Sequence, residues 1–80
     1  MDIAEQVRTV MAKSLMLDPA QLTDNAKLVD DLGVSSLDRF ELAMSLEEAF
    51  DIEMSQEDQD KITTIGEAVR YIEAKVAARG

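Results

Sequence analysis

The stretch that decides how this chain folds is Asp31-Leu32-Gly33-Val34-Ser35-Ser36-Leu37-Asp38, where a loop gives way to a helix. Gly33 can adopt the positive φ that turns the backbone. Ser35 is suited to cap the helix, with Asp38 three residues later as the acid of a capping box. Ser36 then lies in the first turn, where free amides and the helix dipole favour an attached anionic group. A serine at such a position is most often only an N-cap, so both interpretations stay open here.

The helix expected over residues 36–50 has two apolar sides. At about 100° per residue, one side forms the predicted core stripe, which comprises Leu42, Ala43, Leu46, Ala49 and Phe50. Leu37, Phe40 and Met44 fall on the opposite side, beside several acids. A helix packed on one face would expose these three side chains, which predicts a strip that binds a partner. The alternative is that Phe40 packs against the neighbouring loop.

Two segments precede this helix. Asp2, with Glu5 three residues later, predicts a capped amphipathic helix that ends at about Leu15. A long connection over residues 16–34 follows, opened by an Asp-Pro turn signal. Its apolar residues, expected to hold it against the bundle, are Leu22, Leu28, Val29 and Leu32. Such long connections are often functional.

Two further helical segments follow. Ser55 predicts a short capped turn that ends near Lys61, with Ile52, Met54 and Ile62 reaching the core. The capping box of Thr64 and Glu67 opens a last helix that ends near Arg79; its predicted core residues are Ile65, Ala68, Val69, Ile72 and Val76. The fold class is therefore all-α: three longer helices and one short helix around an aliphatic core, with a long first loop.

The length of 80 residues predicts one domain over residues 1–80. No apolar run approaches the ~20 residues that span a bilayer, and no signal-peptide pattern is present, so we expect a cytoplasmic protein. The chain has no His and no Cys. It therefore cannot build a Ser-His-Asp site, a thiolate nucleophile or a zinc site of the usual ligands, and we expect no enzymatic activity.

The formal net charge of −9 is concentrated in the middle of the chain. Residues 30–60 hold one base, Arg39, and eleven acids: Asp30, Asp31, Asp38, Glu41, Glu47, Glu48, Asp51, Glu53, Glu57, Asp58 and Asp60. This surface disfavours nucleic acid as a partner and favours basic protein patches. A calcium-binding loop over residues 51–60 is rejected, because the glycine of the sharp turn and the closing glutamate are absent. No metal site is expected.

Several motifs together resemble bacterial acyl carrier proteins, and the likeness covers essentially all 80 residues. They are Asp31-Leu32-Gly33-Val34-Ser35-Ser36-Leu37-Asp38, Glu41-Leu42, Leu46-Glu47-Glu48-Ala49-Phe50-Asp51-Ile52-Glu53 and Lys61-Ile62-Thr63-Thr64-Ile65-Gly66. The resemblance implies that Ser36 bears a 4′-phosphopantetheine arm whose thiol carries acyl groups as thioesters. It implies a carrier for fatty-acid or related lipid or polyketide synthesis, supplied with the thiol that the chain itself lacks.

The resemblance also implies partners and two binding surfaces. A phosphopantetheinyl transferase, and acyl synthases and transferases with basic patches, would dock on a monomer. The docking residues would be Leu37, Asp38, Phe40, Glu41, Met44, Glu47 and Glu48, with Met54 beside them. The acyl chain would fold back against Leu42, Leu46, Ile62 and Ala68. The alternatives are a carrier of amino-acid or polyketide units, and an acidic helical adaptor without a prosthetic group.

Two residues depart from the family pattern. Ser35 stands where the family usually has aspartate, which removes one negative charge beside the attachment point and predicts a specialised carrier whose partners accept a neutral cap. Arg39 stands where a small neutral residue is more usual. We expect Arg39 to lie near the mouth of the acyl pocket, to snorkel or pair with an acid such as Glu57 or Asp60, and to narrow or redirect chain entry.

Overall fold

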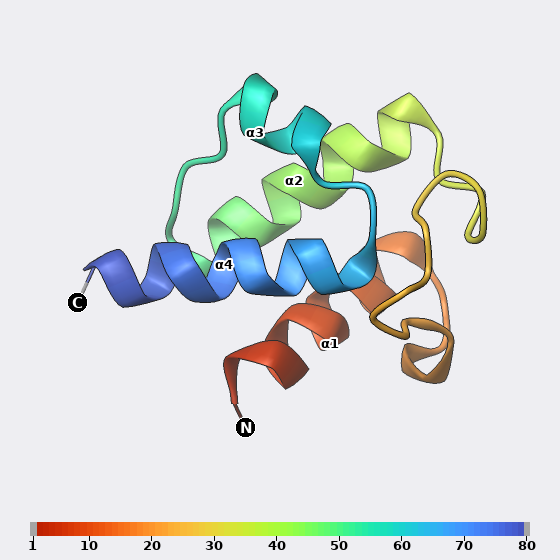
Figure 1. The fold of residues 1–80 in the computed structure, drawn as a ribbon, viewed down its shortest axis with the longest axis horizontal. Coiled ribbons are helices and arrows are strands. Elements are labelled where there is room, and N and C mark those ends of the chain that lie inside the picture. The colour runs from red at the N-terminus through yellow and green to blue at the C-terminus, as the bar shows by residue number, and fades with distance from the viewer. Residues whose placement is uncertain (1, 80) are drawn as a thin grey trace.

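The computed structural model describes residues 2–79 and is built from helices (Figure 1). The elements are α1 (Ile3–Leu15), a 3₁₀ turn η1 (Pro19–Gln21), α2 (Ser36–Phe50), α3 (Gln56–Lys61) and α4 (Ile65–Arg79). Within residues 2–79 the β-type pairing is limited to an isolated antiparallel bridge between Lys27 and Thr64. The predicted fold class, with three longer helices and one short one, is confirmed.

Side-chain caps explain where the helices begin. Asp2 Oδ1 accepts a hydrogen bond from Glu5 N at 2.8 Å at the start of α1. Ser55 Oγ accepts one from Asp58 N at 3.1 Å at the start of α3. Each cap satisfies an amide that has no partner inside its own helix. The predicted starts of these helices are therefore confirmed.

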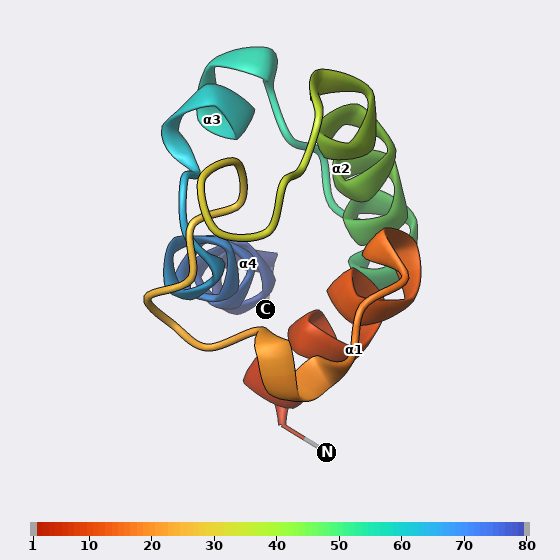
Figure 2. The same ribbon diagram turned by 90° about the vertical axis from the view of Figure 1, so that its right-hand side faces the viewer.

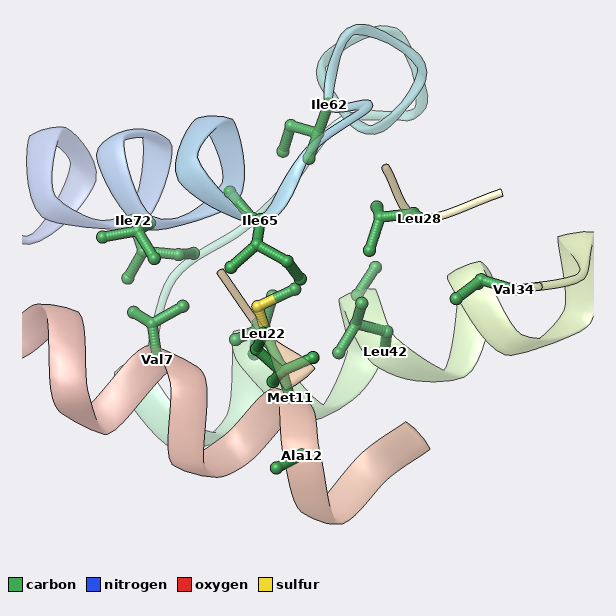
Figure 3. Packing of buried hydrophobic residues seen from close by; sticks show 14 of the residues in the cluster. Val7, Met11, Ala12, Leu22, Leu28, Val34, Leu42, Ile62, Ile65 and Ile72 are labelled. Atoms are coloured by element: carbon green, nitrogen blue, oxygen red, sulfur yellow. The ribbon is translucent and has the colours of Figure 1, made fainter. Parts of the chain in front are cut away.

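The helices enclose a small aliphatic core. Helix α1 packs against both α2 and α4, whereas α3 lies on the side of the bundle away from α1 (Figures 1 and 2). Side chains from every long helix and from the connections meet between them (Figure 3). The largest of the fully buried side chains are Val7, Met11, Leu22, Leu46, Ile65 and Ile72.

Backbone hydrogen bonds fix the long connection to the start of α4. Leu28 N donates to Thr63 O at 2.9 Å, and Gly66 N donates to Asp24 O at 2.9 Å. A Cβ at Gly66 would lie 3.0 Å from the carbonyl oxygen of Asp24, so a side chain there would require the backbone of the connection to shift. The connection is thus held to the bundle by its backbone as well as by its buried leucines.

Two predicted core positions are wrong. Val29 is 55% exposed, because the turn over residues 27–34 is anchored by its buried neighbours Leu28 and Val34. Ala49 is also exposed. The buried stripe of α2 is centred between Leu42 and Phe50, and Ala49 lies at the edge of that stripe.

Candidate functional site

Ser36 is the first residue of α2 and is exposed. The cap of this helix is made by its neighbours: Ser35 Oγ accepts from Asp38 N at 3.1 Å, and Asp38 Oδ2 accepts from Ser35 N at 3.2 Å. The Ser36 hydroxyl makes no hydrogen bond within the described residues. The two serines therefore have different roles, and the predicted capping role of Ser35 is confirmed.

The surroundings of Ser36 suit an anionic group. The amides of Ser36 and Leu37 precede the capped amide of Asp38 and belong to the first turn of the helix, where amides have no intrahelical acceptor. They point toward the end of α2 at which the helix dipole is positive. A phosphodiester on the Ser36 hydroxyl would lie where these amides and the dipole favour negative charge.

The loop before α2 holds this serine in place. Gly33 has φ +67°, the left-handed conformation predicted for the turn. Val34 follows it, is buried, and donates from its amide to Leu28 O at 2.9 Å. Because Leu28 is itself bonded to Thr63, the position of Ser36 depends on the start of α4.

The second apolar side of α2 is exposed, as predicted. Leu37 is 65% exposed, Phe40 54% and Met44 46%. Phe40 is therefore not buried against the neighbouring loop. Glu41 and Glu48 are exposed on the same helix, and neither forms an ion pair within residues 2–79. Three apolar side chains thus lie among free carboxylates.

Two residues predicted for this surface lie differently. Glu47 is half-buried, and its Oε2 accepts from Met54 N at 2.9 Å. Met54 is buried at 8% exposure and does not join the exposed strip. The carboxylate of Glu47 therefore holds the connection after α2, and the side chain of Met54 packs inward.

The four residues predicted for the acyl pocket line one apolar cavity. Leu42, Leu46, Ile62 and Ala68 come together there, and the remaining walls are Leu28, Arg39, Ala43, Met54 and Gln59. The cavity volume is about 30 Å³, which leaves room for only about two or three water-sized groups. An acyl chain of several methylenes would need these walls to separate.

Arg39 lies at the edge of this cavity and is half-buried. Its Nη2 donates to the carbonyl oxygen of Gln59 at 2.8 Å and lies 3.5 Å from that of Ile62. The predicted pairing of Arg39 with Glu57 or Asp60 is wrong. Carbonyls at the end of α3 carry the negative end of its dipole, so they attract the guanidinium. The carbonyl of Gln59 accepts from Ile62 N at 3.2 Å and from Arg39 as well.

The start of α4 is a second capping site. Thr64 Oγ1 accepts from Glu67 N at 3.2 Å. Glu67 Oε1 accepts from the hydroxyl of Thr63 at 2.7 Å and from the amides of Thr63 and Thr64 at 2.9 and 3.0 Å. The side-chain bond from Thr63 and these two amides lower the pKa of Glu67 to about 2.

Two kinds of feature are absent from residues 2–79. No group of three or more His, Cys, Asp or Glu side chains is arranged to hold a metal ion. No helix has both the length and the apolar character that a membrane crossing requires.

Comparison with known proteins identifies the class of this protein. Residues 5–72 match the family described as "Phosphopantetheine attachment site", so the chain is a phosphopantetheine-bearing carrier. It is 45% identical over 76 residues to the acyl carrier protein of Caulobacter vibrioides (strain NA1000 / CB15N), covering 95% of this chain and 97% of that protein.

A second relative agrees. The acyl carrier protein of Phenylobacterium zucineum (strain HLK1) is 42% identical over 77 residues, which cover 96% of this chain and 98% of the relative. The chain belongs to the acyl carrier protein family. Its cofactor is 4′-phosphopantetheine, and it carries acyl groups on that arm.

Proposed function

We propose that Ser36 is the residue to which the phosphopantetheine arm is attached. The observation that carries this proposal is the division between the two serines: Ser35 is occupied as the helix cap, whereas Ser36 has an exposed hydroxyl without a hydrogen bond within residues 2–79. In the attachment step the Ser36 oxygen attacks the phosphorus of a phosphopantetheine donor that is linked through a pyrophosphate and bound by the transferase. The new phosphodiester bond forms as the pyrophosphate P–O bond breaks; the other phosphate leaves, and the hydroxyl proton passes to a base of the transferase. The thiol at the end of the arm then carries the acyl group as a thioester.

The test is an intact mass measured after coexpression with a phosphopantetheinyl transferase. We expect one phosphopantetheine adduct on the wild type, one on Ser35→Ala, and none on Ser36→Ala. Ser35→Ala is the matched control, because it removes a hydroxyl at the adjacent position. An adduct on Ser36→Ala, or no adduct with several transferases, contradicts the proposal. The second result favours the acidic adaptor without a prosthetic group.

We further propose that a docking surface on α2 receives the partner enzymes. It consists of the apolar strip Leu37, Phe40 and Met44, the free carboxylates Glu41 and Glu48, and Asp38 beside the attachment point. Basic patches on a transferase or synthase would pair with the carboxylates, and the apolar side chains would fill pockets between these pairs. Charge on such a surface acts chiefly on the association rate, which falls with added salt.

The remaining assignments follow from family membership. We propose that residues 1–80 act as one domain and as a monomer in the cytoplasm. The chain would serve fatty-acid or related lipid synthesis as a substrate and shuttle, with no catalytic group of its own. The acyl chain would enter between α2 and α3, against Leu42, Leu46, Ile62 and Ala68.

A further inference from the structure

One hydrogen bond crosses the passage between Ser36 and the apolar cavity. A groove beside Ser36 is lined by Arg39, Phe40, Gln56, Gln59 and Asp60. Two residues, Arg39 and Gln59, line both this groove and the cavity. These same two residues are joined by the 2.8 Å bond from Arg39 Nη2 to Gln59 O. A chain that leaves an arm on Ser36 and enters the cavity along this groove must pass that bond.

The bond also ties α3 to α2. No residue of α3 is buried, and the close contacts between helices are those of α1 with α2 and with α4. The short helix is otherwise held to α4 by Tyr71 Oη, which donates to Asp58 Oδ2 at 2.8 Å. Each of these two bonds involves a charged group, which makes it stronger than a hydrogen bond between neutral groups. Arg39 is therefore a principal tether of α3 on the side that faces Ser36.

The size of the cavity gives this tether a consequence. At about 30 Å³ the cavity has room for only about two or three water-sized groups, so a longer chain must move α3 away from α2. We propose that Arg39 is a latch that sets the shortest acyl chain this carrier can bury. The inference rests on the proposed attachment at Ser36. It assigns chain-length selection to a residue that touches neither the attachment point nor the thioester.

The expected threshold follows from two magnitudes. A hydrogen bond to a charged group shifts the equilibrium between the open and the closed state toward the closed state by about 10-fold to 100-fold. Each methylene that enters the apolar cavity favours the open, filled state by about 4-fold. Chains that bury fewer than about two to four methylenes therefore stay outside, and longer chains open the latch.

The test uses carriers loaded with acetyl, butanoyl, hexanoyl and octanoyl groups and measures thioester cleavage by hydroxylamine. A buried thioester chain slows the cleavage. In Arg39→Met, which keeps an unbranched apolar stem and removes the guanidinium donors, we expect protection to begin at a shorter chain than in wild type. At the chain length where protection begins in wild type, hydroxylamine should cleave the thioester of the variant about ten-fold more slowly than that of wild type. Arg70→Met is the matched control, because it removes one charge at an exposed position of α4. Equal thresholds in wild type and Arg39→Met overturn the latch.

A second measurement needs no loaded arm. Amide hydrogen exchange of the unmodified protein should be faster over residues 56–62 in Arg39→Met than in Arg70→Met, while α1 is unchanged. If exchange over residues 56–62 is equally fast in Arg39→Met and Arg70→Met, the latch proposal is wrong. This result does not depend on whether the protein can be modified with phosphopantetheine. The proposal that the arm is attached at Ser36 is tested separately, by the intact mass of the protein after coexpression with a transferase.

Discussion

Helices α2 and α4 begin with the same local device in different surroundings. Each has a hydroxyl residue as cap and an acid three residues later that bonds back to the backbone. At α2 the two partners, Ser35 and Asp38, are exposed, and each side chain accepts a hydrogen bond from the backbone amide of the other residue. At α4 the acid Glu67 accepts three hydrogen bonds, and the turn is fastened to residues 24–28 of the long connection.

The difference shows how one motif serves two purposes. The start of α4 is enclosed by another segment of backbone, so its residues are fixed by packing as well as by capping. The start of α2 is capped by Ser35 and Asp38 alone, and the Ser36 hydroxyl takes no part in that cap. An exposed hydroxyl beside a self-sufficient cap can accept a bulky group without loss of the helix. A group attached to Thr63 or Thr64 would instead disturb the hydrogen bonds that these hydroxyls make with Glu67.

The largest expected effect on stability is at Gly66. We predict that Gly66→Val lowers the free energy of unfolding by about 2–3 kcal/mol, because the added atoms would press on the backbone carbonyl of Asp24. Gly33→Asn is the comparison at the other helix, where nothing lies within 4 Å of a Cβ and asparagine tolerates positive φ. It should cost less than about 1 kcal/mol. Urea denaturation measures both, and equal losses would contradict the contrast.

Removal of each cap should have a smaller effect. Thr64→Ala is expected to cost about 1–2 kcal/mol, since Thr64 is half-buried and its bond to Glu67 N lies against the long connection. Ser35→Ala should cost about 0.5–1 kcal/mol at the exposed start of α2. Thermal denaturation at one ionic strength compares the two variants. A greater loss at Ser35 would reverse our ranking of the two helix ends.

Acid should weaken the cap at the start of α4. The pKa of Glu67 is lowered from its ordinary 4.5 to about 2, chiefly by the bond from the Thr63 side chain. Its contribution to stability is therefore complete above pH 4.5 and is lost as the pH falls toward 2. We predict that Glu67→Gln flattens the decline of the melting temperature in this range. Glu41→Gln, an exposed acid of α2, is the control, and equal acid declines in wild type and Glu67→Gln would contradict the prediction.

The smallest expected change in stability is at Ser35→Asp. Aspartate caps about as well as serine, so the free energy of unfolding should change by less than about 0.5 kcal/mol. The added charge lies beside Ser36, however, and we expect faster modification by a general phosphopantetheinyl transferase. Rates measured by intact mass over time decide this. Equal rates for wild type and Ser35→Asp would count against a carrier specialised for partners that accept a neutral cap.

The sequence predicted the helix starts well, because a cap is local. Ser35 with Asp38, Ser55 with Asp58, and Thr64 with Glu67 each lie three residues apart and are recognisable without a tertiary structure. The four expected pocket residues also meet at one cavity, since the helical period places Leu42 and Leu46 on one face.

Contacts to backbone atoms were beyond prediction. Charge suggested that Arg39 would seek an acid, yet its partner is the carbonyl of Gln59, whose position depends on where α3 ends. In the same way, Glu47 bonds the amide of Met54 and leaves the docking surface. Nearly every residue has a main-chain amide and carbonyl, so the sequence does not indicate which of them a side chain will contact. Gly66 is similar, because its closeness to Asp24 arises only in the folded chain.

The hydrogen bonds between the long connection and the start of α4 also bear on the order of events during synthesis. Leu28 must find Thr63, and Asp24 must find Gly66, across most of the middle of the chain. Such distant pairings form late, because the loop they close costs conformational entropy. While the ribosome still holds residues 63–66, the turn before Ser36 lacks its anchor. We therefore expect the modifying enzyme to act after release of the chain, on molecules that have already folded.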